Sequence, residues 1–337
     1  MRIAVDAMGG DSGVGVVVAG VARFILQGDM DVEIVLVGDS ERIERELSAQ
    51  GRLPVPPRIE HAPEEIQMEE SAATASRRKR DSSIARGILL QKEKKVDAFV
   101  SAGNTGAVVA TSLLSLGRLP GVRRPAIATF VPNEGNGFLL LDVGATKECK
   151  PGDLVQFGQM GAVYAERIMG RENPRVGIVN IGVEESKGNE LTRGAYPLFQ
   201  TSGLDFVGNV EWEGMFQGKV DVAVCDGFVG NVVLKFAEAM VEMIFGSIRK
   251  EMAGRPAAKL GALLMKPTLQ PLKHKLSWEE YGGAPLLGID GICIICHGRS
   301  SPLAIANAVR TASRFVKYDI NKEIGRKLRS YDEVTVE

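Results

Sequence analysis

The feature of this sequence that most constrains its fold is an alternation of short apolar runs with longer segments of helical period. The apolar runs end in Gly, Asp or Asn, and many of them are apolar on both faces. This alternation is typical of a mostly parallel sheet with helices on each side, so we expect a three-layer, Rossmann-like α/β fold. The predicted strands are Ile3–Val5, Ile34–Val37, Ala98–Val100, Phe138–Asp142, Val176–Ile181, Val220–Cys225 and Ile292–Cys296.

One segment, residues 236–283, departs from this alternation. It reads as a long helix followed by a second amphipathic piece, and we expect it to protrude from the sheet. Its apolar residues lie among lysines and arginines, which suits either a dimer contact or shallow insertion at a membrane surface. We predict a single α/β domain over residues 1–337, although this length also allows two lobes that share a cleft. The residues predicted to contact a membrane are Leu260, Leu263, Leu264 and Met265.

Charge and hydropathy argue against several classes of protein. The formal net charge is -1, so the chain as a whole lacks the basic character of a nucleic-acid-binding protein. No apolar run approaches the roughly 20 residues that span a bilayer. The first residues, MRIAVDAMGG, enter a strand-like run without the features of a signal peptide, and the four cysteines are sparse for a disulfide framework. We therefore expect a cytoplasmic protein with reduced thiols.

The turns after the predicted strands hold the unusual chemistry of the chain. Loops at the carboxyl ends of strands line the ligand crevice of open α/β sheets, so we expect these turns to share one edge. Two of them are rich in glycine and precede helices, where backbone N–H groups and the helix dipole bind an oxyanion, although plain capping turns have the same composition. The residues predicted to bind a phosphate-type anion there are Gly9, Gly10, Gly103, Asn104, Thr105 and Gly106.

A turn near the end of the chain is the best catalytic candidate. His297, Arg299 and Ser300 follow an apolar strand and open a helix. Imidazole passes protons near neutral pH, and a guanidinium places two donors on one phosphate. We predict a catalytic role for His297 and phosphate binding for Arg299 and Ser300, while a capping role for His297 stays open.

Charged residues elsewhere are further candidates. Lys187 and Asp226 lie in polar turns, and Lys235 follows Asn231 by one helical turn, so these last two share a face. We predict catalytic roles for Lys187, Asp226 and Lys235, with a solvated lysine as the plainer alternative for Lys235. A basic run suits docking of an acidic protein partner better than nucleic acid, because no aromatic residues are interleaved with it. This run is Arg77, Arg78, Lys79 and Arg80.

Several familiar motifs are rejected. The sequence from Cys293 to His297 formally matches a haem attachment site, but it lies in an apparent strand, where Cys293 and Cys296 face opposite sides of the sheet. The chain lacks a P-loop, and Gly13-Val14-Gly15 lacks the third glycine of a dinucleotide fingerprint. No acidic cluster has clear ligand spacing for a cation. We therefore predict no cofactor and no metal.

Eight segments together resemble the PlsX family of phosphate acyltransferases, in the family's order and over almost the whole chain. The resemblance implies a fold related to phosphotransacetylases and to isocitrate- and isopropylmalate-dehydrogenase-like enzymes. It also implies transfer of a long-chain fatty acyl group from acyl carrier protein to inorganic phosphate, which gives acyl phosphate for phospholipid synthesis. The segments are VDAMGGD, RRKRDSSIARG, FVSAGNTGA, LDVGATKECKP, NIGVEESKGNEL, VAVCDGFVGNVVLK, YGGAPLLGIDG and HGRSSP.

The same resemblance implies partners and a place in the cell. It implies a homodimer that associates peripherally with the inner face of the cell membrane. Acyl carrier protein docks on it, and the downstream membrane glycerol-phosphate acyltransferase is a further expected partner. The basic run and the segment 236–283 agree with these expectations.

A direct mechanism follows as a hypothesis. Phosphate held by the glycine-rich turns attacks the thioester carbonyl without a covalent acyl-enzyme, while Lys235 or Lys187 stabilises the oxyanion and His297 protonates the departing thiolate. Two other functions stay open. One is a hydroxy-acid dehydrogenase of shared architecture, which needs a metal and a nicotinamide cofactor, and the other is a non-catalytic scaffold at the membrane surface.

Overall fold

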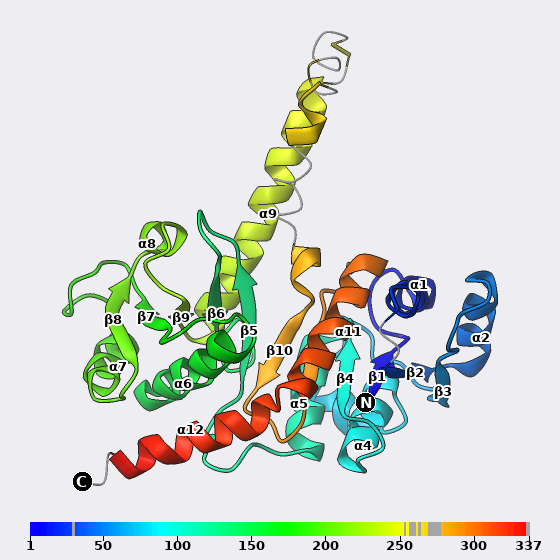
Figure 1. Ribbon diagram of the computed structural model, residues 1–337, viewed down its shortest axis with the longest axis horizontal. Coiled ribbons are helices and arrows are strands. Elements are labelled where there is room, and N and C mark those ends of the chain that lie inside the picture. Colours follow the sequence, from blue (N-terminus) through cyan, green and yellow to red (C-terminus); the bar gives the residue numbers. More distant parts are fainter. Residues whose placement is uncertain (29–30, 253, 256–260, 262–263, 269–277, 335–337) are drawn as a thin grey trace.

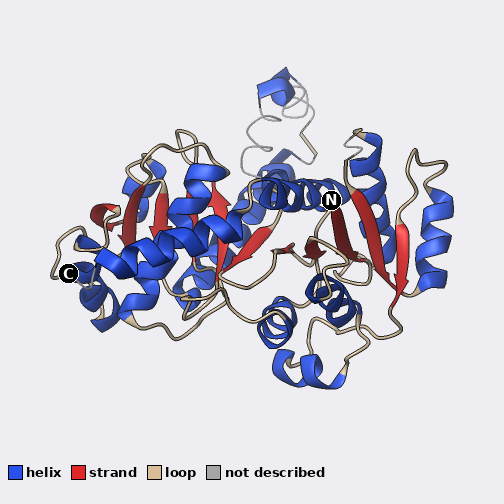
Figure 2. Ribbon diagram, turned by 60° about the horizontal axis from the view of Figure 1, so that its bottom comes forward, coloured by secondary structure: helices blue, strands red, loops and turns tan. Residues whose placement is uncertain are grey.

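The computed structural model describes residues 1–28, 31–252, 254–255, 261, 264–268 and 278–334. Its strands form one 11-stranded sheet in the order β3-β2-β1-β4-β11-β10-β5-β6-β9-β7-β8. Helices cover both faces of this sheet, as Figure 2 shows, which confirms the predicted α/β class. The strands are β1 (Arg2–Asp6), β2 (Glu33–Gly38), β3 (Arg58–His61), β4 (Ala98–Ser101), β5 (Ala126–Val131), β6 (Phe138–Leu141), β7 (Arg175–Val179), β8 (Asp205–Val210), β9 (Val222–Val224), β10 (Ala284–Leu287) and β11 (Cys293–Ile295).

The sheet has two parallel halves joined by an antiparallel seam. Seven of the ten strand pairings are parallel. The three antiparallel pairings join β11 to β10, β10 to β5 and β5 to β6. Because these three antiparallel pairings follow one another across the sheet, the strands β6, β9, β7 and β8 run opposite to β1, β4 and β11. The prediction that all the polar turns share one edge is therefore wrong, because the turns after β6, β7 and β9 leave the sheet in the other direction.

Helices of two groups enclose the sheet. On one face, α3, α4 and α5 cover the first half while α8 and the start of α9 cover the second half. On the other face, α1 and α11 cover the first half, and α6, α7 and α12 cover the second. The helices are α1 (Val14–Leu26), α2 (Ser40–Ala49), α3 (Ala72–Arg78), α4 (Ser83–Lys92), α5 (Thr105–Ser115), α6 (Pro151–Arg167), α7 (Glu190–Gln200), α8 (Trp212–Phe216), α9 (Gly227–Met252), α11 (Pro302–Lys317) and α12 (Ile320–Val334), with a 3-10 turn, η1, at Trp278–Tyr281.

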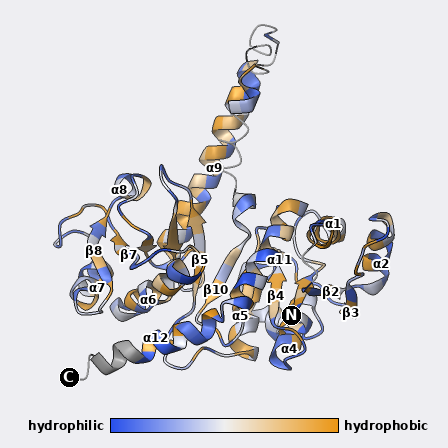
Figure 3. Cartoon of the chain, viewed as in Figure 1, coloured by the Kyte–Doolittle hydropathy of each residue, from blue (hydrophilic) through white to orange (hydrophobic). Residues whose placement is uncertain are grey.

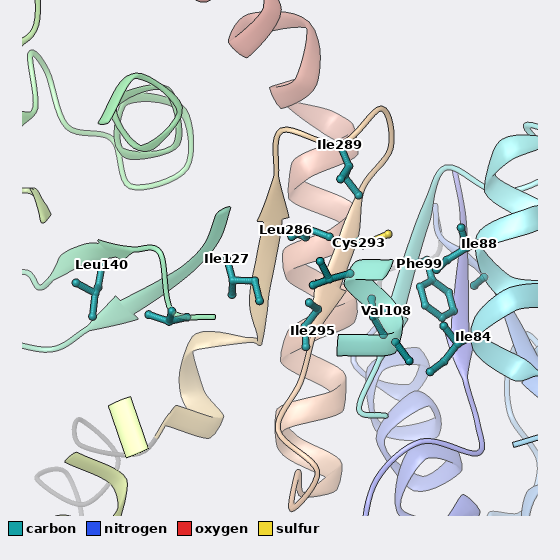
Figure 4. Close-up of a cluster of buried hydrophobic side chains, with 14 of the residues drawn as sticks. Ile84, Ile88, Phe99, Val108, Ile127, Leu140, Leu286, Ile289, Cys293 and Ile295 are labelled. Atoms are coloured by element: carbon teal, nitrogen blue, oxygen red, sulfur yellow. The ribbon is translucent and has the colours of Figure 1, made fainter. Parts of the chain in front are cut away.

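One hydrophobic cluster crosses the seam and ties the halves together. It runs from Phe99 of β4 through Cys293 of β11 and Leu286 of β10 to Leu140 of β6, and Figure 4 shows these side chains along one face of the sheet. Cys296 belongs instead to the cluster on the opposite face. The two cysteines therefore point to different sides, as predicted, which leaves no shared site for a metal or a disulfide.

Helix α9 projects from the body of the molecule. Its first turn packs against the sheet, where Gly227 and Gly230 are buried, and its outer part extends away from both halves (Figure 1). The predicted protrusion is confirmed, but the helix begins at Gly227 rather than at residue 236. The glycines explain the difference, because they let the helix start close against the backbone after β6 and β9.

The projecting part of α9 keeps apolar side chains in solvent. Phe236, Met243 and Ile248 are among its exposed residues, and Figure 3 shows apolar bands along this part of the helix. Of the residues predicted to contact a membrane, Leu264 and Met265 are exposed, whereas Leu260 and Leu263 lie outside the described residues. Within the described ranges, no helix has the length and apolar content to cross a bilayer.

Asp142 organises the seam directly after β6. Its buried carboxyl accepts hydrogen bonds from the backbone N–H groups of Ile127 (2.8 Å), Gly144 (3.0 Å), Ala145 (3.0 Å) and Thr146 (2.6 Å). Burial raises the pKa of this carboxyl to about 6, although the four hydrogen bonds favour its ionised form. The folded chain therefore holds the Asp142 proton more tightly than the unfolded chain does.

This pKa predicts a pH dependence of stability. Because the pKa of Asp142 is higher in the folded state than the unfolded value of about 3.9, its contribution to stability is complete below about pH 4 and is lost as the pH rises through 6. Two pKa units correspond to about 3 kcal/mol. We expect the free energy of unfolding of wild type, relative to that of Asp142→Asn, to fall by about this amount between about pH 4 and pH 7. Denaturant titrations of both proteins measure it, and a constant difference would contradict the assignment.

Candidate functional site

Three charged or titratable side chains meet where β11 ends and α9 passes it. Lys235 Nζ lies 2.9 Å from Glu238 Oε2 and 3.1 Å from His297 Nε2, and His297 Nε2 lies 3.5 Å from the same Glu238 oxygen. Lys235 and Glu238 come from neighbouring turns of α9, and His297 comes from the turn after β11. Helix α9 thus carries residues of the second half of the sheet to the carboxyl end of the first half.

The His297 ring is held in one orientation. Its Nδ1 accepts a hydrogen bond from the backbone N–H of Arg299 at 3.1 Å. We assign the proton of the neutral ring to Nε2, because Nδ1 uses its lone pair in this bond. Nε2 therefore acts as a donor, beside the ammonium of Lys235. Two donors side by side favour an acceptor between them, and Glu238 Oε2 fills that role in this structure.

Glu238 is a site residue that the sequence analysis missed. Only 13% of its side chain is exposed. Burial opposes its ionisation, but hydrogen bonds from His297 and Lys235 outweigh burial and lower the pKa of the carboxyl. The helical spacing could have found it, because Glu238 continues the face of α9 that Asn231 and Lys235 define.

The two residues predicted to bind phosphate after β11, Arg299 and Ser300, differ in burial. Arg299 is exposed, and its guanidinium pairs with Glu242 of α9 at 2.9 Å. Ser300 is 4% exposed, and among the described residues its Oγ has no hydrogen-bond partner. The turn thus follows α9 for a further helical turn beyond Glu238, but Arg299 and Ser300 point to different surroundings.

The two glycine-rich turns pack against each other. A Cβ on Gly9 would lie 2.5 Å from the backbone nitrogen of Gly103, and Asp6 receives the backbone N–H groups of Met8 and Gly9. Ser101 donates its hydroxyl to Asp6 at 2.7 Å and accepts the N–H of Gly103. The main structural role of these glycines is therefore to let the two turns approach each other closely.

Little space remains among these glycines. The hollow that Gly9, Gly10, Gly298 and Ser300 line has a volume of about 10 Å³. A volume of this size holds at most one water molecule, which is far smaller than phosphate. The structure therefore does not place a phosphate-sized cavity at Gly9 and Gly10, where the sequence predicted anion binding.

A larger cleft lies beside His297 at the seam. We call it the seam cleft; it has a volume of about 150 Å³. Ile127, Val143, Leu234 and Ile295 form much of its apolar wall, and its polar lining includes Thr105, Asn231, Lys235, Glu238 and His297. Thr105 is the first residue of α5, so the positive end of that helix dipole also faces the cleft. The seam cleft thus combines an apolar wall with polar and cationic groups that suit an anion.

Asn104 anchors the start of α5 with its whole side chain. Its Oδ1 caps the helix by accepting the N–H of Ala107 at 3.0 Å. Its Nδ2 donates to the backbone oxygens of Gln67 (3.2 Å), Met68 (3.0 Å) and Glu70 (3.1 Å). The side chain predicted to bind phosphate is thus engaged with the protein, and it positions Thr105 and the exposed Gly106 instead.

Replacing Asn104 therefore tests a structural role. We expect Asn104→Ala to lower the free energy of unfolding by roughly 2–4 kcal/mol, because it removes a cap and three hydrogen bonds to partly buried carbonyl groups. Asn104→Ser keeps a capping oxygen, so it should be about 1 kcal/mol more stable than the alanine variant. Chemical denaturation measures both values. Equal stability of all three proteins would show that these bonds contribute nothing.

Two predicted catalytic residues have structural contacts in their own turns. Asp226 Oδ1 accepts the N–H groups of Phe228 and Val229, both at 2.9 Å, and so caps the start of α9. Lys187 lies in the turn after β7, where its backbone N–H donates to Glu184. Neither residue lines the seam cleft. The structure brings Lys235, not Lys187, to His297.

The residues of the predicted docking run differ in how far they are exposed. Lys79 is partly buried and forms an ion pair with Glu70 at 2.5 Å. Arg77, Arg78 and Arg80 are exposed. Helix α3, which carries the first two arginines, packs against α5. Three arginines of the run are thus exposed, and α3 packs against the helix whose first residue, Thr105, lines the seam cleft.

Comparison with known proteins identifies the family. A family model described as fatty acid synthesis protein matches residues 1–323. A phosphate acyltransferase of Desulfitobacterium hafniense strain Y51 is 50% identical over 329 residues that cover 97% of each chain, and one of Heliobacterium modesticaldum is 51% identical over 320 residues that cover 94% of each. The chain belongs to the PlsX family of phosphate acyltransferases. As a PlsX family member it is an acyltransferase of fatty acid and phospholipid synthesis.

Solved structures support the fold that the PlsX resemblance implied. A phosphotransacetylase from Streptococcus pyogenes superposes with a TM-score of 0.62 at 17% identity, and the match covers 94% of each chain. The EutD phosphotransacetylase from Staphylococcus aureus gives a TM-score of 0.61 at 15% identity with the same coverage. At these identities the likeness concerns the fold alone, and the predicted relation to phosphotransacetylases is confirmed.

Proposed function

We propose that this PlsX family member transfers a long-chain acyl group from acyl carrier protein to inorganic phosphate, and that the product is acyl phosphate for phospholipid synthesis. The observation that carries the proposal is the composition of the seam cleft. Its apolar wall suits the first carbons of an acyl chain, while Lys235, His297 and the N-terminus of α5 suit a phosphate and a developing oxyanion. Both reactants thus meet at one polar end.

Direct attack of phosphate on the thioester needs no proton from the protein. An oxygen of monohydrogen phosphate bonds to the thioester carbonyl carbon, the carbon–sulfur bond breaks, and the phosphate proton leaves with the thiol. His297 has Nδ1 occupied by the Arg299 N–H, so we assign it a hydrogen bond from Nε2 to the oxyanion or the departing sulfur rather than proton transfer. Lys235 supplies positive charge beside it, and Glu238 positions both.

The basic surface of Arg77, Arg78 and Arg80 is our proposed docking site for the carrier. An acidic partner gains association rate from such a patch, and helix α3 lies against α5, whose first residue lines the seam cleft. The exposed apolar residues of α9, such as Phe236 and Met243, support a second contact, with a partner subunit or a membrane surface. We place the protein in the cytoplasm, at the inner face of the membrane, on this basis.

The test measures release of free carrier from palmitoyl carrier protein at increasing concentrations of inorganic phosphate, without nucleotide. We expect release to depend on phosphate and to saturate. Release that is independent of phosphate would indicate a thioesterase, and no release would reject the donor. Arg77→Ala with Arg78→Ala should raise KM for the carrier-bound donor while kcat changes little, because surface charges act mainly on association.

A further inference from the structure

A second hollow adjoins the seam cleft and shares two aromatic side chains with it. Phe130 and Tyr281 line both, and their ring centroids lie 4.3 Å apart. We call this space, of about 490 Å³, the arginine hollow. Its cationic lining is Arg171, which follows α6, and Arg310 and Arg314 of α11.

The hollow carries excess positive charge. Arg310 donates to the side-chain oxygens of Asn307 and Gln27, and Arg314 donates to the backbone oxygen of Ile168. Within the part of the chain that the structure describes, neither arginine pairs with a carboxylate. Arg310 and Arg314 are four residues apart on one helix, where like charges repel each other.

The third arginine is partly neutralised. Arg171 Nε lies 3.7 Å from Asp221, and its Nη2 donates to the backbone oxygens of Asn136 and Gly137. Among the lining residues that the structure describes, Glu280 is the one carboxylate. Three guanidinium groups against one lining carboxylate leave the hollow cationic, and each guanidinium has five N–H donors, more than these bonds use.

This lining suits a phosphate ester. Guanidinium groups place paired donors on phosphate oxygens, and Asn136, Asn307 and Thr311 add polar side chains. Phe130, Tyr164 and Tyr281 offer apolar surface to the organic part of the ester. A purely structural role, in which the arginines only neutralise the end of α6, would require neither this volume nor the aromatic wall.

We infer that the arginine hollow binds the phosphate of a phosphate ester, and that the ester is the phosphopantetheine arm on which the donor carries its acyl group. The inference rests on the proposed function, because the arm then spans from the hollow to the seam cleft that shares its aromatic wall. A free phosphorylated metabolite offers the same chemistry and is the alternative source.

Binding without turnover separates this inference from the proposed function. Isothermal titration measures binding of phosphopantetheine and of pantetheine, which lacks the phosphate, to wild type and to Arg310→Gln and Arg314→Gln. We expect wild type to prefer phosphopantetheine, and each variant to lose roughly 10- to 100-fold in affinity for it, as for loss of a charge-assisted hydrogen bond. Lys317→Gln, a charge removed from the same helix outside the hollow, should bind as wild type does.

Two other outcomes of the titration would change or overturn the inference. If glycerol phosphate binds, both arginine variants lose it, and phosphopantetheine does not bind, the site takes phosphate esters from the free pool rather than from the donor's arm. If both variants keep the wild-type affinity for each ester while circular dichroism shows them folded, the inference is overturned. Carrier release by wild type is measured separately, so failure of the acyl transfer would not be mistaken for failure of the hollow.

Discussion

Replacing His297 with alanine is expected to lower kcat by roughly 100- to 1,000-fold, the usual cost of removing one donor that faces a developing oxyanion. The ring is fixed by the Arg299 N–H, and its Nε2 lies beside Lys235 Nζ, so alanine removes one of two convergent donors. KM for phosphate should change far less than kcat, because Lys235 and the start of α5 remain. Steady-state kinetics with acyl donor and phosphate measure both constants.

Two further variants make this result specific. His297→Gln retains an N–H donor of similar reach, so it should keep more activity than the alanine variant. His61→Ala removes an exposed histidine at the end of β3 and should leave kcat unchanged, because the described hydrogen bonds of its side chain are to Ser40, away from the seam cleft. Equal activity of wild type and His297→Ala would remove His297 from the mechanism.

Gly230→Ala is expected to have the largest effect on stability. A Cβ at this position would overlap the carbonyl oxygen of Asp142 and lie 3.0 Å from Cys225 Sγ. These atoms belong to the turns after β6 and β9, which have little freedom to move, since Asp142 is held by four backbone hydrogen bonds. Overpacking against backbone should lower the free energy of unfolding by roughly 3–5 kcal/mol.

Helix α9 offers a matched control for that variant. A Cβ on Gly246 would meet no atom within 4 Å, and the residue is exposed in the projecting part of the same helix. Gly246→Ala should therefore stabilise the protein slightly, by about 0.5–1 kcal/mol, through helix propensity. Thermal and denaturant unfolding measure both variants. Similar effects of the two substitutions would contradict the close packing of α9 on the seam.

The sequence predicted those strands whose side chains are buried on both faces. All seven predicted strands are present, and none of their bounds differs from the prediction by more than two residues. The strands that it missed are the sheet edges, β3 and β8, and the seam strands, β5 and β10. The edge strands are partly exposed, which weakens an apolar run. Strand β10 follows the projecting segment, and no local sequence pattern indicates that it pairs antiparallel with both of its neighbours.

The site was predictable by residue type but not by position. The motif after β11 indicated His297, and the helical spacing linked Asn231 to Lys235. Strand direction decided the rest, because the reversal at the seam keeps Lys187 in a separate turn, while α9 brings Lys235 to His297. Asn104 was predicted to bind phosphate and Asp226 to be catalytic, yet in the structure both side chains hydrogen-bond backbone groups of the protein. Capping and ligand binding use the same residue types, so sequence alone does not separate them.

Acyl transfer to phosphate is tested most directly by following labelled phosphate into the product. Purified protein is incubated with palmitoyl carrier protein and radiolabelled inorganic phosphate, and the acyl phosphate is trapped with hydroxylamine while free carrier is counted. We expect labelled acyl phosphate in equal amount to released carrier, with both strongly reduced in His297→Ala. Carrier release without labelled acyl phosphate, or equal product from His297→Ala, would contradict acyl transfer to phosphate at the seam cleft.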